Sequence, residues 1–149
     1  MIYSQMSALL NFEIRNLLKD YLELHLPKLG DNWWQEHVIN ELSITQSRRV
    51  REMSIVSLSG LDLAALLRLL LKNLFDLSWK TEIAVSQLRA LLRKVQEIRN
   101  RWAHPTEDSP DYYEVRKDIQ ALYDLAIALD ASTSTLRSCL LYTSDAADE

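Results

Sequence analysis

Hydrophobic positions in the chain recur mostly with a helical spacing. From Met6 to Leu26 apolar residues return every three or four positions, and Pro27 and Gly30 then interrupt the pattern. This spacing is typical of a helix that buries one face, and proline with glycine is a common stop signal. The pattern therefore predicts a first long helix over Met6–Leu26.

A second, less regular helical stretch is expected to begin at Asn32, because Gln35 follows it in a capping-box-like pattern. The most apolar segment of the chain, Leu63–Phe75, comes after a Ser59-x-x-Asp62 start signal. Apolar residues occupy almost the whole circumference of this segment. It is therefore predicted to be a central helix that touches its neighbours on several sides.

Two further helices complete the pattern. The first is expected from about Glu82 to about Ala103, where Pro105 stops it. Ser109-Pro110 is a favourable start for the last helix, with serine as the cap and proline in the first turn. The chain has only two Gly and three Pro, which argues against the frequent turns of a sheet protein. The sequence predicts an all-α fold, a bundle of about five helices.

Composition limits the class of protein. With 149 residues, 48% hydrophobic and 26% charged, the chain is expected to form one globular domain over residues 1–135, followed by a disordered tail over 136–149. No basic stretch followed by an apolar run marks a signal peptide, and no run approaches the roughly 20 apolar residues of a membrane span. The expected location is the cytoplasm, with no membrane contact.

The end of the chain carries the single cysteine, Cys139. The run from residue 139 to 149 resembles a translated sequencing-library adapter, and we interpret it as an artefact that replaces the continuation of a longer natural gene. The run holds three acidic residues and no basic one. Without it, 17 basic residues face 18 acidic ones, so the net charge changes from −4 to −1. The acidity of the whole chain is therefore a poor guide to its partners.

The helix predicted over 82–103 carries the candidate chemistry. At about 100° per residue, Arg99 falls on the same face as the apolar positions around it. A buried guanidinium needs a carboxylate, a water-filled cleft or an anionic ligand. Asn100 and His104 flank it and are four residues apart, so these three side chains are predicted to share one pocket near the end of the helix.

Several basic residues surround this segment. Arg89, Arg93 and Arg101 are candidates for binding an RNA backbone, and the alternative is an ordinary solvated helix face. The chemistry of the residues alone also allows a plainer interpretation of the pocket. In that interpretation Arg99 is a structural arginine paired with an acid, and His104 caps the helix end.

The run Glu97-Ile98-Arg99-Asn100-Arg101-Trp102-Ala103-His104-Pro105 resembles the signature of HEPN domains, in which an arginine and a polar residue precede a histidine. The resemblance extends over roughly residues 15–130, through Gly30-Asp31-Asn32-Trp33-Trp34, the Leu61–Phe75 helix and the tyrosine-rich last helix. These segments resemble one subgroup, which includes the helical domain attached to a nuclear mRNA-surveillance endoribonuclease. Similar domains head large bacterial proteins with ATPase or helicase parts.

The resemblance implies a homodimer in which two such motifs face one cleft, and active members cut RNA without a metal. It then implies Arg99, Asn100 and His104 as catalytic residues, RNA as ligand, 2′,3′-cyclic phosphate products and a defence or stress role. It also implies a C-terminal ATPase or helicase-like region in the natural protein. No metal or other cofactor is expected, since His and acidic residues show no metal-site spacing.

Two other functions stay open. Many HEPN domains are non-catalytic, so the chain is alternatively a module that dimerises, or senses RNA or a nucleotide, and regulates a C-terminal ATPase or nuclease. A third alternative is a purely structural helical adaptor. An open, positively lined cleft around Arg99 and His104 favours the nuclease, whereas a closed network of ion pairs favours the regulator.

Overall fold

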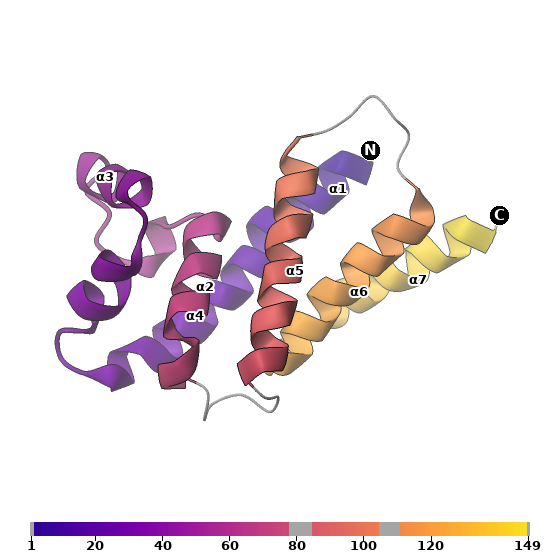
Figure 1. Ribbon diagram of the computed structural model, residues 1–149. Coiled ribbons are helices and arrows are strands. Elements are labelled where there is room, and N and C mark those ends of the chain that lie inside the picture. Colours follow the sequence, from indigo (N-terminus) through magenta and orange to yellow (C-terminus); the bar gives the residue numbers. More distant parts are fainter. Residues whose placement is uncertain (1, 78–84, 105–110, 149) are drawn as a thin grey trace.

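A computed structural model gives the fold of the chain, and it describes residues 2–77, 85–104 and 111–148, with the side chains of 3–77, 85–104 and 111–141. These residues form helices and connecting turns without a strand, which confirms the predicted all-α class. Seven α-helices lie in the described part (Figure 1): α1 Ile2–Ala8, α2 Arg15–His25, α3 Ile44–Glu52, α4 Leu63–Leu77, α5 Val85–Ala103, α6 Tyr112–Ala128 and α7 Ser134–Asp148. None of the helices in this part is long and apolar enough to span a membrane.

The first long helix is a single rod made of α1, a π-helical stretch Leu9–Ile14, and α2 (Figure 1). Its buried stripe repeats every four residues and is nearly inaccessible to solvent throughout: Met6, Leu10, Ile14, Leu18, Leu22 and Leu26. In a regular α-helix a spacing of four drifts by about 40° per repeat. A π-helical turn contains more residues, so a spacing of four rotates in the opposite direction there and compensates part of this drift. The stripe therefore stays on one side of the rod.

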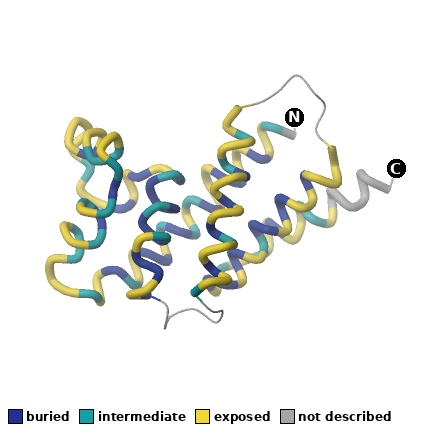
Figure 2. Tube along the Cα trace, viewed as in Figure 1, coloured by how far each residue is buried: buried dark blue, intermediate teal, exposed yellow. Residues whose placement is uncertain are grey.

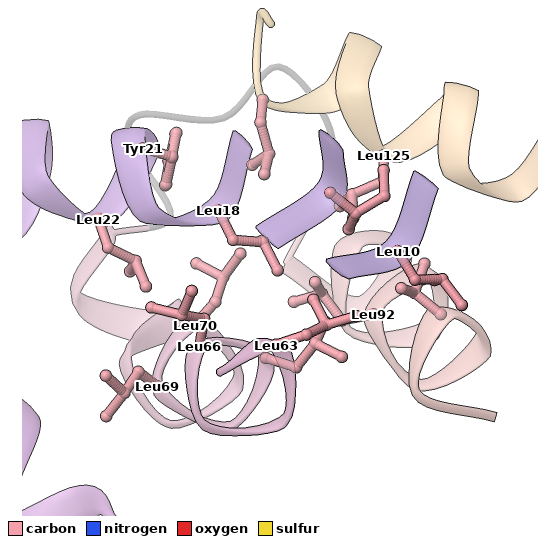
Figure 3. Packing of buried hydrophobic residues seen from close by; sticks show 14 of the residues in the cluster. Leu10, Leu18, Tyr21, Leu22, Leu63, Leu66, Leu69, Leu70, Leu92 and Leu125 are labelled. Atoms are coloured by element: carbon pink, nitrogen blue, oxygen red, sulfur yellow. The ribbon is translucent and has the colours of Figure 1, made fainter. Parts of the chain in front are cut away.

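The core lies where α4 and α5 pack against this rod. Leu18 and Leu22 of α2 point toward Leu66 and Leu70 of α4, as Figure 3 shows. Figure 2 shows α4 as one of the most buried segments, in agreement with its predicted central place. Its buried residues are Leu63, Ala65, Leu66, Leu67, Leu69, Leu70, Asn73, Leu74 and Leu77.

The segment between α2 and α4 is the least regular part of the fold. It contains a short π-helical stretch Trp34–Val38, a 3-10 turn Ile39–Glu41, and α3. No side chain caps the start at Asn32, and the capping box lies at Ser43 and Gln46 instead, where each side chain bonds the other's backbone N–H at 3.1 Å. This box places Gln46 at the first turn of α3, beside the cleft described below.

Helices α4 and α5 run antiparallel, and α6 then packs along α5 (Figure 1). The described part of α5 begins at Val85, and the predicted start near Glu82 lies outside the described residues. Asp111 caps α6 by accepting a hydrogen bond from the Tyr113 N–H at 2.9 Å. Ser109 and Pro110, where the start signal was predicted, lie outside the described residues.

The end of the chain differs from the disordered tail that the sequence predicted over 136–149. The structure has a helix there, α7, which packs against α6 (Figure 1). Leu136 is only 2% exposed and belongs to the core, while Cys139 and Leu140 are partly buried against it. These three positions share one helical face, and this short apolar stripe explains why the segment joins the bundle.

A cationic cleft between α4 and α5

A cleft of about 540 Å³ opens between α4 and α5, with Gln46 of α3 at its margin. Its volume falls within the range of about 300–1,000 Å³ that is usual for ligand sites. The residues that line it are Gln46, Ala64, Leu67, Arg68, Leu71, Lys72, Arg89, Arg93, Gln96, Arg99 and Asn100. Helix α5 contributes polar and charged side chains to this lining, and the wall formed by α4 is partly apolar.

The α5 wall follows from helical spacing. Arg89, Arg93, Gln96 and Asn100 are separated by four, three and four residues, so they form one stripe along the helix. The neighbouring stripe is fully buried and consists of Leu88, Leu92, Val95 and Ile98. Packing of this apolar stripe against the core therefore fixes the polar stripe at the mouth of the cleft.

The α4 wall carries two cations that sequence reasoning did not assign to the site. Arg68 and Lys72 are four residues apart and lie on the same face as Ala64. Arg68 donates its Nε–H to the backbone carbonyl of Glu41 at 2.7 Å, which anchors the base of its guanidinium. The signal in the sequence was the pair of positive charges one turn apart inside a mostly apolar helix.

Charge is strongly one-sided in the cleft. Five lining side chains are cationic, namely Arg68, Lys72, Arg89, Arg93 and Arg99, and none of the lining residues is acidic. Among the residues that the structure describes, none of these five cations pairs with a carboxylate. Unpaired like charges held together repel one another, and an anion that enters the cleft relieves this repulsion.

Arg99 and Asn100 lie at the end of the cleft nearest the C-terminus of α5. Arg99 is half-buried, at the edge of the apolar stripe rather than in its middle, and its Nη1 donates to the Asn100 Oδ1 at 3.1 Å. Because α5 turns by about 100° per residue, the guanidinium reaches the cleft from the flank of the buried stripe. Two of the three side chains that were predicted to share one pocket, those of Arg99 and Asn100, thus line the same open cleft.

His104 is not brought into this cleft. It follows the last residue of α5, its side chain is exposed, and it is not among the lining residues. Its backbone N–H donates to the Arg101 carbonyl at 3.4 Å, which continues the last turn of the helix. Within one chain, the structure thus joins Arg99 and Asn100 and leaves His104 at the surface, one turn beyond Asn100.

Arg101 does not line the cleft, and its side chain, which is 44% exposed, contacts a buried carboxylate of α6. Its Nη1 donates to both carboxylate oxygens of Asp118, at 3.1 Å and 2.9 Å. The Trp102 Nε1–H donates to the same carboxylate at 2.7 Å, and Asp118 is 1% exposed. Trp102 also packs edge-on against Tyr3 of α1, with ring centroids 4.9 Å apart. The structure therefore gives Arg101, predicted as an RNA-binding residue, a structural partner.

The described residues contain no group of three or more His, Cys, Asp or Glu side chains placed to hold a metal ion. Near the cleft the acidic residue Asp62 faces Arg49 at 3.7 Å, outside the lining. The chemistry that the cleft offers is that of a cation-lined anion site with three amides, Gln46, Gln96 and Asn100, that can orient oxygen atoms.

Comparison with known protein families places the chain. Residues 9–128 match the model of a protein family described as Swt1-like HEPN. No curated protein and no solved structure matches the chain. The family match spans most of the rod, the cleft and α6, and it confirms the resemblance drawn from the segment between Arg99 and His104.

Proposed function

The chain belongs to the Swt1-like HEPN family, and on this premise we propose that it is a metal-independent endoribonuclease domain that acts as a dimer. One observation carries the proposal. Arg99 and Asn100, the first two residues of the HEPN motif, are hydrogen-bonded to each other and line an open cleft that is cationic and free of acidic lining residues. RNA is a polyanion, which suits a cationic cleft, and its 2′-hydroxyl is the nucleophile of the cleavage reaction.

Each motif residue has a role that its chemistry suits. A histidine takes the proton of the 2′-hydroxyl as that oxygen attacks the phosphorus, and the bond from phosphorus to the 5′-oxygen breaks. The 5′-oxygen leaves with a proton from an acid, so the products are a 2′,3′-cyclic phosphate and a 5′-hydroxyl. Arg99 stabilises the charge that develops on the phosphate oxygens, and Asn100 holds the phosphate or the histidine in place.

The position of His104 supports a dimeric site. Its side chain is exposed beyond the end of α5 and is available to a second copy of the chain. If two α5 ends meet, His104 of the partner subunit approaches the cleft that contains Arg99. The proton transfer then belongs to the dimer, since one chain alone does not place a histidine among the lining residues.

The second candidate is a non-catalytic module that binds RNA or a nucleotide and regulates another domain of a longer protein. The same position of His104 favours it, because a cleft with five cations and no histidine binds phosphate without a group to move protons. A defence or stress role and a C-terminal ATPase or helicase-like region remain part of both proposals.

RNA cleavage in EDTA separates these candidates. The wild type is expected to release fragments with cyclic phosphate ends, and His104→Ala and Arg99→Ala are each expected to lose activity by about 10²–10⁴-fold. Lys94→Ala is the matched control, because Lys94 is exposed on the same helix and does not line the cleft. A folded, dimeric wild type that leaves RNA intact but binds it would support the regulatory module instead.

A further inference from the structure

The two walls of the cleft present their cations toward one another. Arg89, Arg93 and Arg99 come from α5, whereas Arg68 and Lys72 come from α4. The two helices are antiparallel neighbours (Figure 1). A ligand in the cleft is therefore contacted from both sides, unlike a ligand on a single basic helix.

The uncharged lining indicates what is recognised. Ala64, Leu67 and Leu71 are the apolar residues of the lining, and none of the lining residues is aromatic. Proteins that recognise unpaired bases usually stack them on aromatic side chains. The cleft lacks that platform and offers guanidinium and ammonium groups, so its chemistry suits phosphates rather than bases.

The length of the cationic stripe suits several phosphates in a row. Arg89 and Arg99 are ten residues apart, which at a rise of 1.5 Å per residue gives about 15 Å along α5. This length accommodates about four consecutive phosphates at the roughly 3.4 Å rise per nucleotide of a stacked strand. A double helix cannot lie between the side chains of two helices that pack directly against each other, because the axes of such helices are about 8–10 Å apart.

We propose that the α4–α5 cleft is a track for the backbone of single-stranded RNA, in which Arg68 and Lys72 hold the strand against the α5 arginines. This rests on the proposed ribonuclease function, and it adds two binding residues and a requirement for an unpaired strand. The strand runs from the Lys72 and Arg89 end toward Arg99 and Asn100, where the phosphate to be cut is held. Recognition along the track is independent of base sequence.

Binding of a strand that cannot be cut tests the track apart from catalysis. The probe is a single-stranded oligonucleotide of about eight 2′-O-methyl nucleotides, which lacks the attacking hydroxyl. Its dissociation constant is measured over a series of salt concentrations. With about four phosphates neutralised, the logarithm of the affinity is expected to fall with the logarithm of salt at a slope of about −3.

Arg68→Gln and Lys72→Gln are each expected to weaken binding and to make this slope about 0.7 less steep. Lys72→Gln leaves the hydrogen bond between Arg68 and the Glu41 carbonyl intact, so it tests the α4 wall even if Arg68→Gln unfolds. Lys94→Gln removes a charge of the same sign from α5 outside the cleft, and it is expected to keep the wild-type slope.

Several outcomes overturn the track. It is contradicted if the salt slopes of Lys72→Gln and Arg68→Gln equal that of the wild type. It is also contradicted if a fully paired duplex binds with the same affinity as the single strand, or if a nucleoside triphosphate binds more tightly than the strand and displaces it. Failure of the nuclease is seen separately. If the 2′-O-methyl strand binds with the expected salt slopes and unmodified RNA stays intact, the proposed track is supported and the ribonuclease function is not. If RNA is cleaved but the α4 variants keep the wild-type slope, the ribonuclease function is supported and the track is not.

Discussion

Two arginines of the same helix, Arg99 and Arg101, have opposite roles in this molecule. Arg99 is half-buried beside a cleft and has no carboxylate partner among the described residues. Arg101 contacts both oxygens of a carboxylate on α6 that is almost completely buried. Residues two apart on a helix point about 200° apart, so the backbone alone sends these side chains to different sides.

The difference separates a binding face from a structural face. On the α6 side, a buried acid is satisfied by Arg101 and Trp102, and this network ties the end of α5 to its neighbours. On the α4 side, cations are gathered without acids, an arrangement that costs stability unless an anion is bound. The first face holds the end of α5 in place so that the second can present Arg99 and Asn100 to the cleft.

The largest expected effect on stability comes from replacing one arginine on each face by glutamine. Arg101→Gln leaves the buried Asp118 carboxylate with the Trp102 N–H but without its cation, so the free energy of unfolding is expected to fall by about 2 kcal/mol. Arg99→Gln removes a charge that has no carboxylate partner among the described residues, and it is expected to stay within about 0.5 kcal/mol of the wild type. Urea unfolding of the two variants measures both values.

A double replacement sharpens this prediction. Arg101→Met together with Asp118→Leu removes both members of the ion pair, and it is expected to recover part of the stability lost in Arg101→Gln. In that protein Trp102 keeps its packing against Tyr3, but its indole N–H loses its acceptor, so the recovery is incomplete. Equal losses in Arg99→Gln and Arg101→Gln would contradict the division into a binding face and a structural face.

Most of the fold could be predicted from the spacing of apolar residues. The long helices, including the central Leu63–Leu77 helix, agree with the pattern because tertiary packing and helical period require the same positions. The prediction of a disordered end differs from the structure, which has α7 there. Leu136, Cys139 and Leu140 form too short an apolar stripe to stand out among serine and threonine residues.

The site was only half visible in the sequence. Arg89, Arg93, Arg99 and Asn100 lie in one cleft because they share a helix, and helical spacing can be read directly. Arg68 and Lys72 belong to another helix, and which helix covers which face depends on packing. Asp118 was missed for the same reason, since an acid within an amphipathic helix is ordinarily exposed and nothing local reveals that it faces Arg101.

A smaller effect is expected from the indole group on the structural face. Trp102→Phe keeps an aromatic ring beside Tyr3 but removes the N–H that donates to Asp118 at 2.7 Å. A hydrogen bond to a charged group contributes about 1.5–3 kcal/mol, and Arg101 still satisfies the carboxylate in this variant. We therefore expect a loss of about 1.5 kcal/mol in thermal or urea unfolding, with strand binding in the cleft unchanged.

The smallest expected effect has the opposite sign and belongs to the binding face. Arg89 and Arg93 are like charges one turn apart, and such a pair destabilises a helix by about 0.2–0.5 kcal/mol. Arg89 has no acidic residue three or four positions away, so Arg89→Gln is expected to raise the free energy of unfolding by about 0.3 kcal/mol at low salt. The gain disappears at about 1 M salt, where charges are screened over about 3 Å.

Lys94→Gln is the control for this last change, because Lys94 is an exposed cation of the same helix and lies outside the cleft. It has Glu97 three residues further along the helix, so its removal is expected to bring no gain. This contrast between the two variants is expected if the cleft is cationic in order to bind a ligand. Removing a cleft charge then raises the stability of the free protein and weakens ligand binding. If both replacements shift stability equally at every salt concentration, the cleft charges behave as an ordinary solvated surface, and the functional argument for this face loses its support.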